Sequence, residues 1–238
     1  MSTRSLRVVV VAVLTACATA AEARDGKVEA RMPVRWDAHL LEGLSSGHPS
    51  APGDFAAVLN GPWDSPLELI VDTAGVLQDV TVRDCASLLA ISKERVWSTR
   101  TEPIGTERAW RVTCGALSRM PRARPSRVSY VSLDVEALLP ALAHLDVTKR
   151  PSSDTGYFRE LRDRLEIRCF GEDRCIIRTP GEQFAIDLLA VGDFNGDGVE
   201  DVMGQSSAGP VEGTAVAARG FIVTRKRPGG ALTLLEWW

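Results

Sequence analysis

Residues 184–201 read FAIDLLAVGDFNGDGVED, a strand-like apolar run followed at once by a loop rich in acidic residues and glycine. The run from Phe184 to Val191 has the length and composition of one strand. The loop from Asp193 to Asp201 contains an Asn-Gly and an Asp-Gly dipeptide, which are common in hairpin turns. This stretch therefore predicts a hairpin in the C-terminal third of the chain.

The loop also places oxygen-bearing side chains at its positions 1, 3, 5 and 9. Calcium takes about six to eight oxygen ligands, and alternate residues of a tight loop can converge on one ion. Gly198 permits the sharp turn, after which the carbonyl of Val199 can face inward. A turn without an ion is the alternative, and magnesium fits less well because it retains water ligands. The predicted ligands of Ca²⁺ are Asp193, Asn195, Asp197, Val199 and Asp201.

The spacing of these ligands differs from that of an EF-hand, which requires glutamate at position 12, where this chain has Gly204. The carboxylate at position 9 makes the loop resemble the DxNxDGxxD calcium hairpins of FG-GAP repeats, found in integrin-type propellers and in many bacterial surface proteins. The match runs from Ala190 to Gly204, without the Phe-Gly opening of that repeat and without a second copy in the chain. A propeller needs about four to eight blades. The resemblance thus implies a calcium hairpin and no propeller.

The first 23 residues predict an export signal. Arg4 and Arg7 precede an apolar stretch from Val8 to Ala16, and small residues follow. A membrane-spanning helix would need about 20 apolar residues, so this stretch is too short for one. We therefore expect the protein to be exported.

Two processing routes are open at the end of this signal. Leu14-Thr15-Ala16-Cys17 resembles the lipobox of bacterial lipoproteins, which implies lipidation of Cys17 and an outer-membrane anchor. Ordinary cleavage after Ala20 or Ala23 is the alternative and would leave the protein in the periplasm or secreted.

Either route removes Cys17 from the five cysteines and leaves four that can pair as two disulfides in an oxidising compartment. Cys169 and Cys175 lie between two strand-like runs and predict a hairpin with clamped ends. Cys85 and Cys114 then pair by elimination, although the other two connectivities stay open. A zinc site is not expected, because no CxxC pair exists and the histidines are scattered.

The chain divides by composition into four parts. After the signal, residues 24–53 are polar and predict a flexible tether, residues 54–150 an α+β region, and residues 151–238 an antiparallel β region carrying the loop. A single domain over residues 54–238 is the alternative. The expected fold is α+β and β-rich, with an antiparallel sheet in the C-terminal third, a few short helices and two disulfides. The expected strands cover 67–71, 76–82, 110–114, 126–133, 220–225 and 231–238, and the expected helices cover 85–92 and 135–145.

Charge and composition limit the possible partners. The formal net charge is −3 and is spread along the chain, so nucleic acid is not an expected partner. Contact with a membrane is expected only through the lipid anchor. The segment from Arg119 to Arg127 holds four arginines and two prolines, which we interpret as a solvated loop.

Catalytic motifs are not recognisable in the sequence. His39, His48 and His144 lie outside any nucleophile motif, and Asp187 with Glu200 or Asp201 is a carboxylate pair of a kind that arises by chance. The sequence favours a non-catalytic extracytoplasmic binding protein with one structural Ca²⁺ and a protein partner in the cell envelope. Its architecture loosely resembles periplasmic lipoproteins that block cell-wall hydrolases, which implies an immunity or inhibitor protein. The alternative is a calcium-dependent hydrolase of a cell-envelope polymer.

Overall fold

The computed structural model describes residues 34–36, 49, 52–97, 101–131, 138, 142, 166–171, 173–211 and 217–238. Its larger sheet has the order β10-β9-β8-β7-β6-β5, with β1 paired to a further part of β7, and its smaller sheet has the order β3-β2-β4. The elements are β1 (Val34–Trp36), η2 (Pro52–Asp54), α1 (Phe55–Asn60), β2 (Leu67–Thr73), β3 (Val76–Val82), α2 (Cys85–Ala90), η3 (Lys93–Arg95), β4 (Val96–Trp97), α3 (Thr101–Arg119), η4 (Met120–Arg122), β5 (Glu166–Phe170), β6 (Arg174–Arg178), β7 (Glu182–Gly192), β8 (Asp201–Pro210), β9 (Ala217–Thr224) and β10 (Thr233–Trp237).

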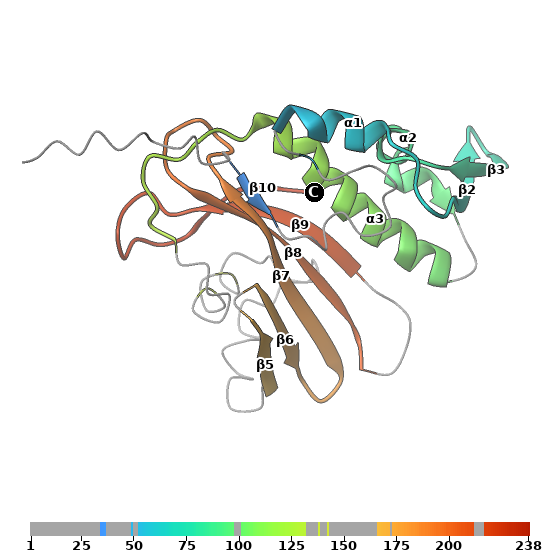
Figure 1. Ribbon diagram of the computed structural model, residues 1–238. Coiled ribbons are helices and arrows are strands. Elements are labelled where there is room, and N and C mark those ends of the chain that lie inside the picture. The colour runs from blue at the N-terminus through green and yellow to red at the C-terminus, as the bar shows by residue number, and fades with distance from the viewer. Residues whose placement is uncertain are drawn as a thin grey trace, which may run out of the picture. The chain divides into compact units, whose positions relative to one another are not determined.

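The larger sheet is antiparallel and open, because its path ends at β10 on one side and at β5 on the other. From β5 to β10, strands that follow one another along the chain are neighbours in the sheet, and α3 lies across β9 (Figure 1). The predicted fold is confirmed: an α+β, strand-rich chain with an antiparallel sheet in its C-terminal third, two disulfides and no propeller. None of the described helices combines the length and the apolar character needed to cross a bilayer.

Buried side chains on both faces of the larger sheet form two separate cores. Ile222 of β9 belongs to the core that includes α1, α2 and α3, whereas its neighbours Phe221 and Val223 belong to the other core. This split follows from the strand geometry, because successive side chains point to opposite faces. The second core includes Leu138 and Leu142, the two described residues of the helix predicted over 135–145. The loop between β7 and β8 is thus attached to a sheet that is buried on both sides.

Several local predictions are confirmed. The strands β2 and β3 join at a two-residue turn in which Ala74 and Gly75 both have positive φ, and Asp72 accepts a hydrogen bond from Gly75 N at 2.7 Å. Asp84 caps α2 by accepting from Ser87 N at 2.7 Å, as the sequence predicts, although the helix ends at Ala90. The side chains concerned act on backbone two or three residues away, so local sequence is sufficient to specify them.

One part of the predicted tether is instead a strand. The segment Val34–Trp36 pairs with β7 in the register Val34 opposite Gly192 and Trp36 opposite Ala190. The strand β7 is longer than β6, whose partners on β7 end at Asp187. The remaining edge of β7 is therefore open to another strand, which the sequence of residues 24–53 could not reveal.

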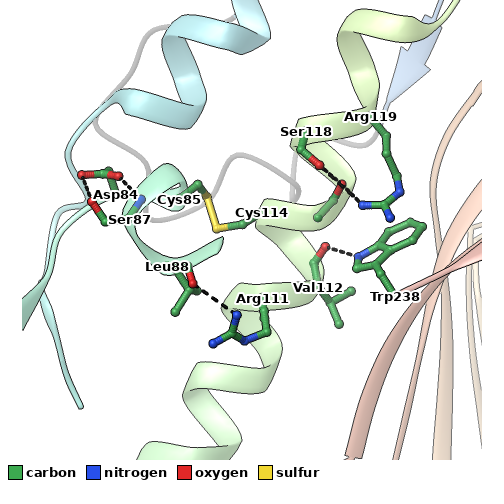
Figure 2. The surroundings of a disulfide bond; sticks show 11 residues. Asp84, Cys85, Ser87, Leu88, Arg111, Val112, Cys114, Ser118, Arg119 and Trp238 are labelled. Atoms are coloured by element: carbon green, nitrogen blue, oxygen red, sulfur yellow. Dashed lines mark hydrogen bonds between the residues drawn. A yellow bond between two sulfur atoms is a disulfide. The ribbon is translucent and has the colours of Figure 1, made fainter. Parts of the chain in front are cut away.

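The strand predicted over residues 110–114 is wrong, because this segment lies inside α3. Val112, Cys114, Ala116 and Leu117 are all buried there. Figure 2 shows the reason: α2 contacts one side of α3 through the Cys85–Cys114 disulfide, and Trp238 covers another side. A helix buried on several sides loses the regular polar face that a short window of sequence would show.

The last strand and its terminal residue connect the sheet to α3. Trp238 Nε1 donates to Val112 O at 3.0 Å, and the Arg119 guanidinium lies 3.9 Å from the centroid of the Trp238 ring (Figure 2). Arg119 and Arg122 donate to the Glu236 carboxylate at 2.5 and 2.9 Å. Two arginines of the segment predicted as a solvated loop are therefore bound to β10.

This ion pair predicts an acid-sensitive contribution to stability. Burial raises the pKa of Glu236, but the hydrogen bonds and charges of Arg119 and Arg122 outweigh it, so the pKa lies below its usual value. A lowered pKa stabilises the fold above the unfolded-state pKa, and this gain disappears as the pH falls through the folded-state pKa. Glu236→Gln should cost about 1 kcal/mol near pH 7 and almost nothing at an acid pH below the folded-state pKa of Glu236, as measured by urea unfolding. An equal cost at both pH values would contradict an electrostatic role.

Candidate metal centre

The acidic loop joins β7 to β8 at the end of their ladder. The last pair of this ladder is Gly192 with Asp201, so residues 193–200 form the connection. Asp193 is 2% exposed and Asp201 is fully buried, whereas Asn195 and Asp197 are exposed and Val199 is half-buried. Four of the five predicted ligand positions lie in this connection, and the fifth, Asp201, is the first residue of β8. The two outer carboxylates are inside the protein, and the side chains of Asn195 and Asp197 are at the surface.

The side chains at positions 1, 3 and 5 fold the loop by accepting hydrogen bonds from its own amides. Asp193 Oδ1 accepts from Gly196 N at 2.6 Å, and Asp193 Oδ2 accepts from Gly198 N at 2.8 Å. Asn195 Oδ1 accepts from Asp197 N at 2.8 Å, and Asp197 Oδ1 accepts from Val199 N at 2.8 Å. Gly196 and Gly198 have φ of 81° and 84°, a conformation that favours glycine. The sequence thus encodes the loop conformation locally.

Asp201 is the unusual member of the set. Its Oδ2 accepts from Phe194 N at 2.9 Å, but its Oδ1 is buried and has no hydrogen-bond partner among the described residues. Burial raises the pKa of Asp201, and the charges of Asp197 and Asp193 raise it further. The nearby Thr224 hydroxyl and the hydrogen bond from Phe194 N lower the pKa, but by less, so it stays above its usual value. Thr224 lies close enough to affect this pKa, although its Oγ1 has no partner with hydrogen-bond geometry. A buried carboxylate oxygen without a partner is energetically unfavourable.

These residues fit a hard cation in their chemistry. Four of the five residues offer a side-chain oxygen, and Val199 offers its backbone carbonyl. A carboxylate oxygen has two lone pairs, so an amide hydrogen bond leaves it able to bind an ion. The unpartnered Asp201 Oδ1 is the position where a cation would supply what is missing. Within the described part of the chain, however, no three or more His, Cys, Asp or Glu side chains converge on one point. The loop oxygens named above face backbone amides instead.

A segment that the sequence did not connect with the loop lies directly on it. We call residues 124–129 the strap. Arg124 N donates to Asp193 O at 2.8 Å and Arg124 O accepts from Asp193 N at 3.1 Å, while Arg127 N and Val128 N both donate to Gly198 O. Glu200 N donates to Val128 O at 2.7 Å. The strand predicted over 126–133 is wrong as far as Val131: this part of the segment has one isolated bridge, between Val128 and Val199, and no strand.

Glu200, which lies in the chain between the predicted ligands Val199 and Asp201, holds the strap through its side chain. Its carboxylate accepts from Ser129 Oγ at 2.7 Å and from Ser126 Oγ at 3.4 Å. Loop and strap are distant in sequence and show no shared pattern, so only a residue-pair signal from related chains could have predicted this contact.

The other predicted site residues fall into separate places. The disulfides are Cys169–Cys175, which the hairpin predicts, and Cys85–Cys114, the pair left by elimination. Asp187 lies opposite Gln205 and forms an ion pair with Arg174. Asp201 lies opposite Gly192, which is five residues further along β7 than Asp187. The structure therefore does not bring Asp187 and Asp201 together as a carboxylate pair. Cys17, His39, His48 and His144 lie outside the described residues.

Comparison of the chain with protein-family models, with curated proteins and with solved structures finds no match. The resemblance to FG-GAP hairpins rests on the ligand spacing of the loop.

Proposed function

We propose that this chain is an exported, non-catalytic binding protein in which one structural Ca²⁺ stabilises the β7–β8 loop. The observation that carries the proposal is the fully buried Asp201, whose Oδ1 has no hydrogen-bond partner among the described residues. The residues that would hold the ion are Asp193, Asn195, Asp197, Val199 and Asp201. A bound cation would neutralise carboxylates that otherwise repel one another in a small volume.

The position of the loop supports a structural rather than a catalytic role for the ion. The loop joins two neighbouring strands of the larger sheet and holds the strap by backbone hydrogen bonds. An ion at this point would fix the end of the sheet and the segment that follows η4. Two disulfides fit an oxidising compartment, which supports export to the periplasm or, with lipidation of Cys17, to the outer membrane. In the sharper form of the proposal the partner is an envelope-acting hydrolase, and this protein is its inhibitor or immunity protein.

Thermal unfolding with calcium and with EDTA tests the ion. An ion bound only by the folded state stabilises it by about 2.7 kcal/mol when free calcium is about a hundredfold above Kd. For a chain of this size we expect the melting temperature to be roughly 5–10 °C higher in calcium than in EDTA. Identical melting temperatures in the two conditions would contradict the proposal.

The variant Asp201→Asn tests in the same experiment whether Asp201 is a ligand, because it keeps the shape of the side chain and removes its charge. In EDTA the variant should melt above the parent, since a buried charge without a counter-ion is lost. In calcium it should melt below the parent, since a ligand is lost. Asp79→Asn changes the same charge on the exposed side of β3 and should show neither effect. A variant that responds to calcium as the parent does would exclude Asp201 as a ligand.

A further inference from the structure

Two arginine side chains lie over the glycines of the loop. A Cβ atom added to Gly196 would lie 3.4 Å from Arg124 Nη1, and one added to Gly198 would lie 3.5 Å from Arg127 Cδ. Both arginines are exposed, and in the part of the chain that the structure describes neither forms an ion pair with a carboxylate. Val128, which follows Arg127 in the chain, is 40% exposed. The strap thus presents two cationic groups and an apolar side chain to solvent.

The backbone that carries these arginines is held in place. Its hydrogen bonds to Asp193, Gly198 and Glu200 fix both ends of the strap on the loop. The Arg225 guanidinium donates to Tyr130 O at 3.4 Å, just beyond the strap. Binding groups on a pre-organised backbone lose less conformational entropy when a partner arrives. This distinguishes the strap from a solvated arginine-rich loop.

Further cations lie at the same end of the sheet. Thr224 is paired with Asp201, so Arg225, Lys226 and Arg227 follow β9 at the end where the acidic loop precedes β8. Lys226 and Arg227 are exposed, and neither has an ion-pair partner among the described residues. As long as no cation is bound to the loop, the negative charges of its carboxylates offset these positive charges. A divalent cation in the loop would leave this end of the sheet more positive.

We propose that the strap, through Arg124 and Arg127, is a docking surface for an acidic segment of a protein partner, and that calcium in the loop strengthens the docking. The inference rests on the proposed function for its dependence on calcium. A guanidinium binds a carboxylate through two parallel hydrogen bonds, and arginine is enriched at protein interfaces. A phosphate polymer fits less well, because it has no apolar group to pack on the exposed Val128 beside Arg127, whereas a polypeptide does.

Fluorescence anisotropy with a labelled peptide of alternating glutamate and serine tests the proposal. The full protein is titrated at low ionic strength in calcium and in EDTA, with a glutamine–serine peptide as the neutral control. We expect roughly tenfold weaker binding for Arg124→Gln/Arg127→Gln in calcium, as for two lost exposed charge pairs. For the parent we expect a Kd several-fold lower in calcium than in EDTA. The paired control is Arg168→Gln/Arg178→Gln on β5 and β6, which changes the charge equally and should bind as the parent does.

The outcomes separate this inference from the proposed function. Parent-like binding by the Arg124/Arg127 variant, or no binding by the parent in calcium, overturns the docking surface even if calcium raises the melting temperature. Binding that depends on the arginines but not on calcium, with no effect of calcium on melting, supports the surface and overturns the ion. Tighter binding of a polyphosphate than of the peptide overturns the choice of partner. The melting temperature of each variant is measured beside the titration to show that it is folded.

Discussion

Replacing Gly204 by alanine is expected to destabilise the protein by about 3 kcal/mol, the upper end of the cost of overpacking a core. An added Cβ would lie 2.8 Å from Phe221 Cε2 and 2.9 Å from Asp187 O, and it would come closer still to Phe221 Cζ. Phe221 is 1% exposed and cannot swing into solvent, and Asp187 O belongs to the backbone of β7. Strands β7, β8 and β9 would have to separate at this point. Urea unfolding measures the effect.

The control for this substitution is Gly181→Ala. Nothing lies within 4 Å of a Cβ added there, so the change should alter stability by less than about 1 kcal/mol. Equal effects of the two substitutions would show that β8 and β9 are not packed as described. Gly204 also stands at position 12 counted from Asp193, where an EF-hand requires glutamate. The close approach of Phe221 explains why this position carries no side chain here.

Removal of the Cys85–Cys114 disulfide is the second large effect. The bridge joins α2 to α3 and closes a separation of 29 residues, and both sulfurs are in fully buried residues (Figure 2). Loss of a constraint on the unfolded chain over this length costs about 3.5 kcal/mol. We therefore expect Cys85→Ala/Cys114→Ala to lower the free energy of unfolding by about that amount, measured in guanidinium chloride without reductant.

The second disulfide supplies the comparison. Cys169 and Cys175 close a separation of only 6 residues between adjacent strands, so Cys169→Ala/Cys175→Ala should cost about 2 kcal/mol. In addition, Arg111 Nη1 donates to Leu88 O and Ile91 O, which holds α3 to the end of α2 independently of the sulfurs (Figure 2 shows the bond to Leu88). The first variant should therefore fold, with reduced stability. A larger loss for the second pair would contradict the loop-length argument.

Hairpins and caps are the parts of the fold that the sequence predicted well. The β2–β3 turn, the Asp84 cap and the β5–β6 hairpin each depend on residues a few positions apart. Their backbone hydrogen bonds close locally, so turn chemistry and alternation are enough to identify them. The folding of the acidic loop by Asp193, Asn195 and Asp197 belongs to the same class.

The errors have a common physical origin in contacts between distant segments. The helix α3 was predicted in part as a strand because α2 and Trp238 bury it on more than one side. Val34–Trp36 was predicted as tether because the edge that it fills belongs to β7, more than a hundred residues away. The local sequence of α3 and of Val34–Trp36 contains no signal for the distant segments that contact them, so a prediction from a short window of residues misses these contacts.

By itself the sequence determined the acidic loop as a hairpin connection with four oxygen-bearing side chains and one backbone carbonyl as candidate ligands, the candidate disulfides and the strand-rich C-terminal third. Only the tertiary structure decided that Asp201 is buried with an unpartnered oxygen, that Glu200 holds the strap, and that two arginines cover the loop glycines. The two groups of features differ in the sequence separation of the residues that stabilise them. Turns and caps are stabilised within a few residues, whereas burial and long-range pairing depend on which segments the whole chain brings together.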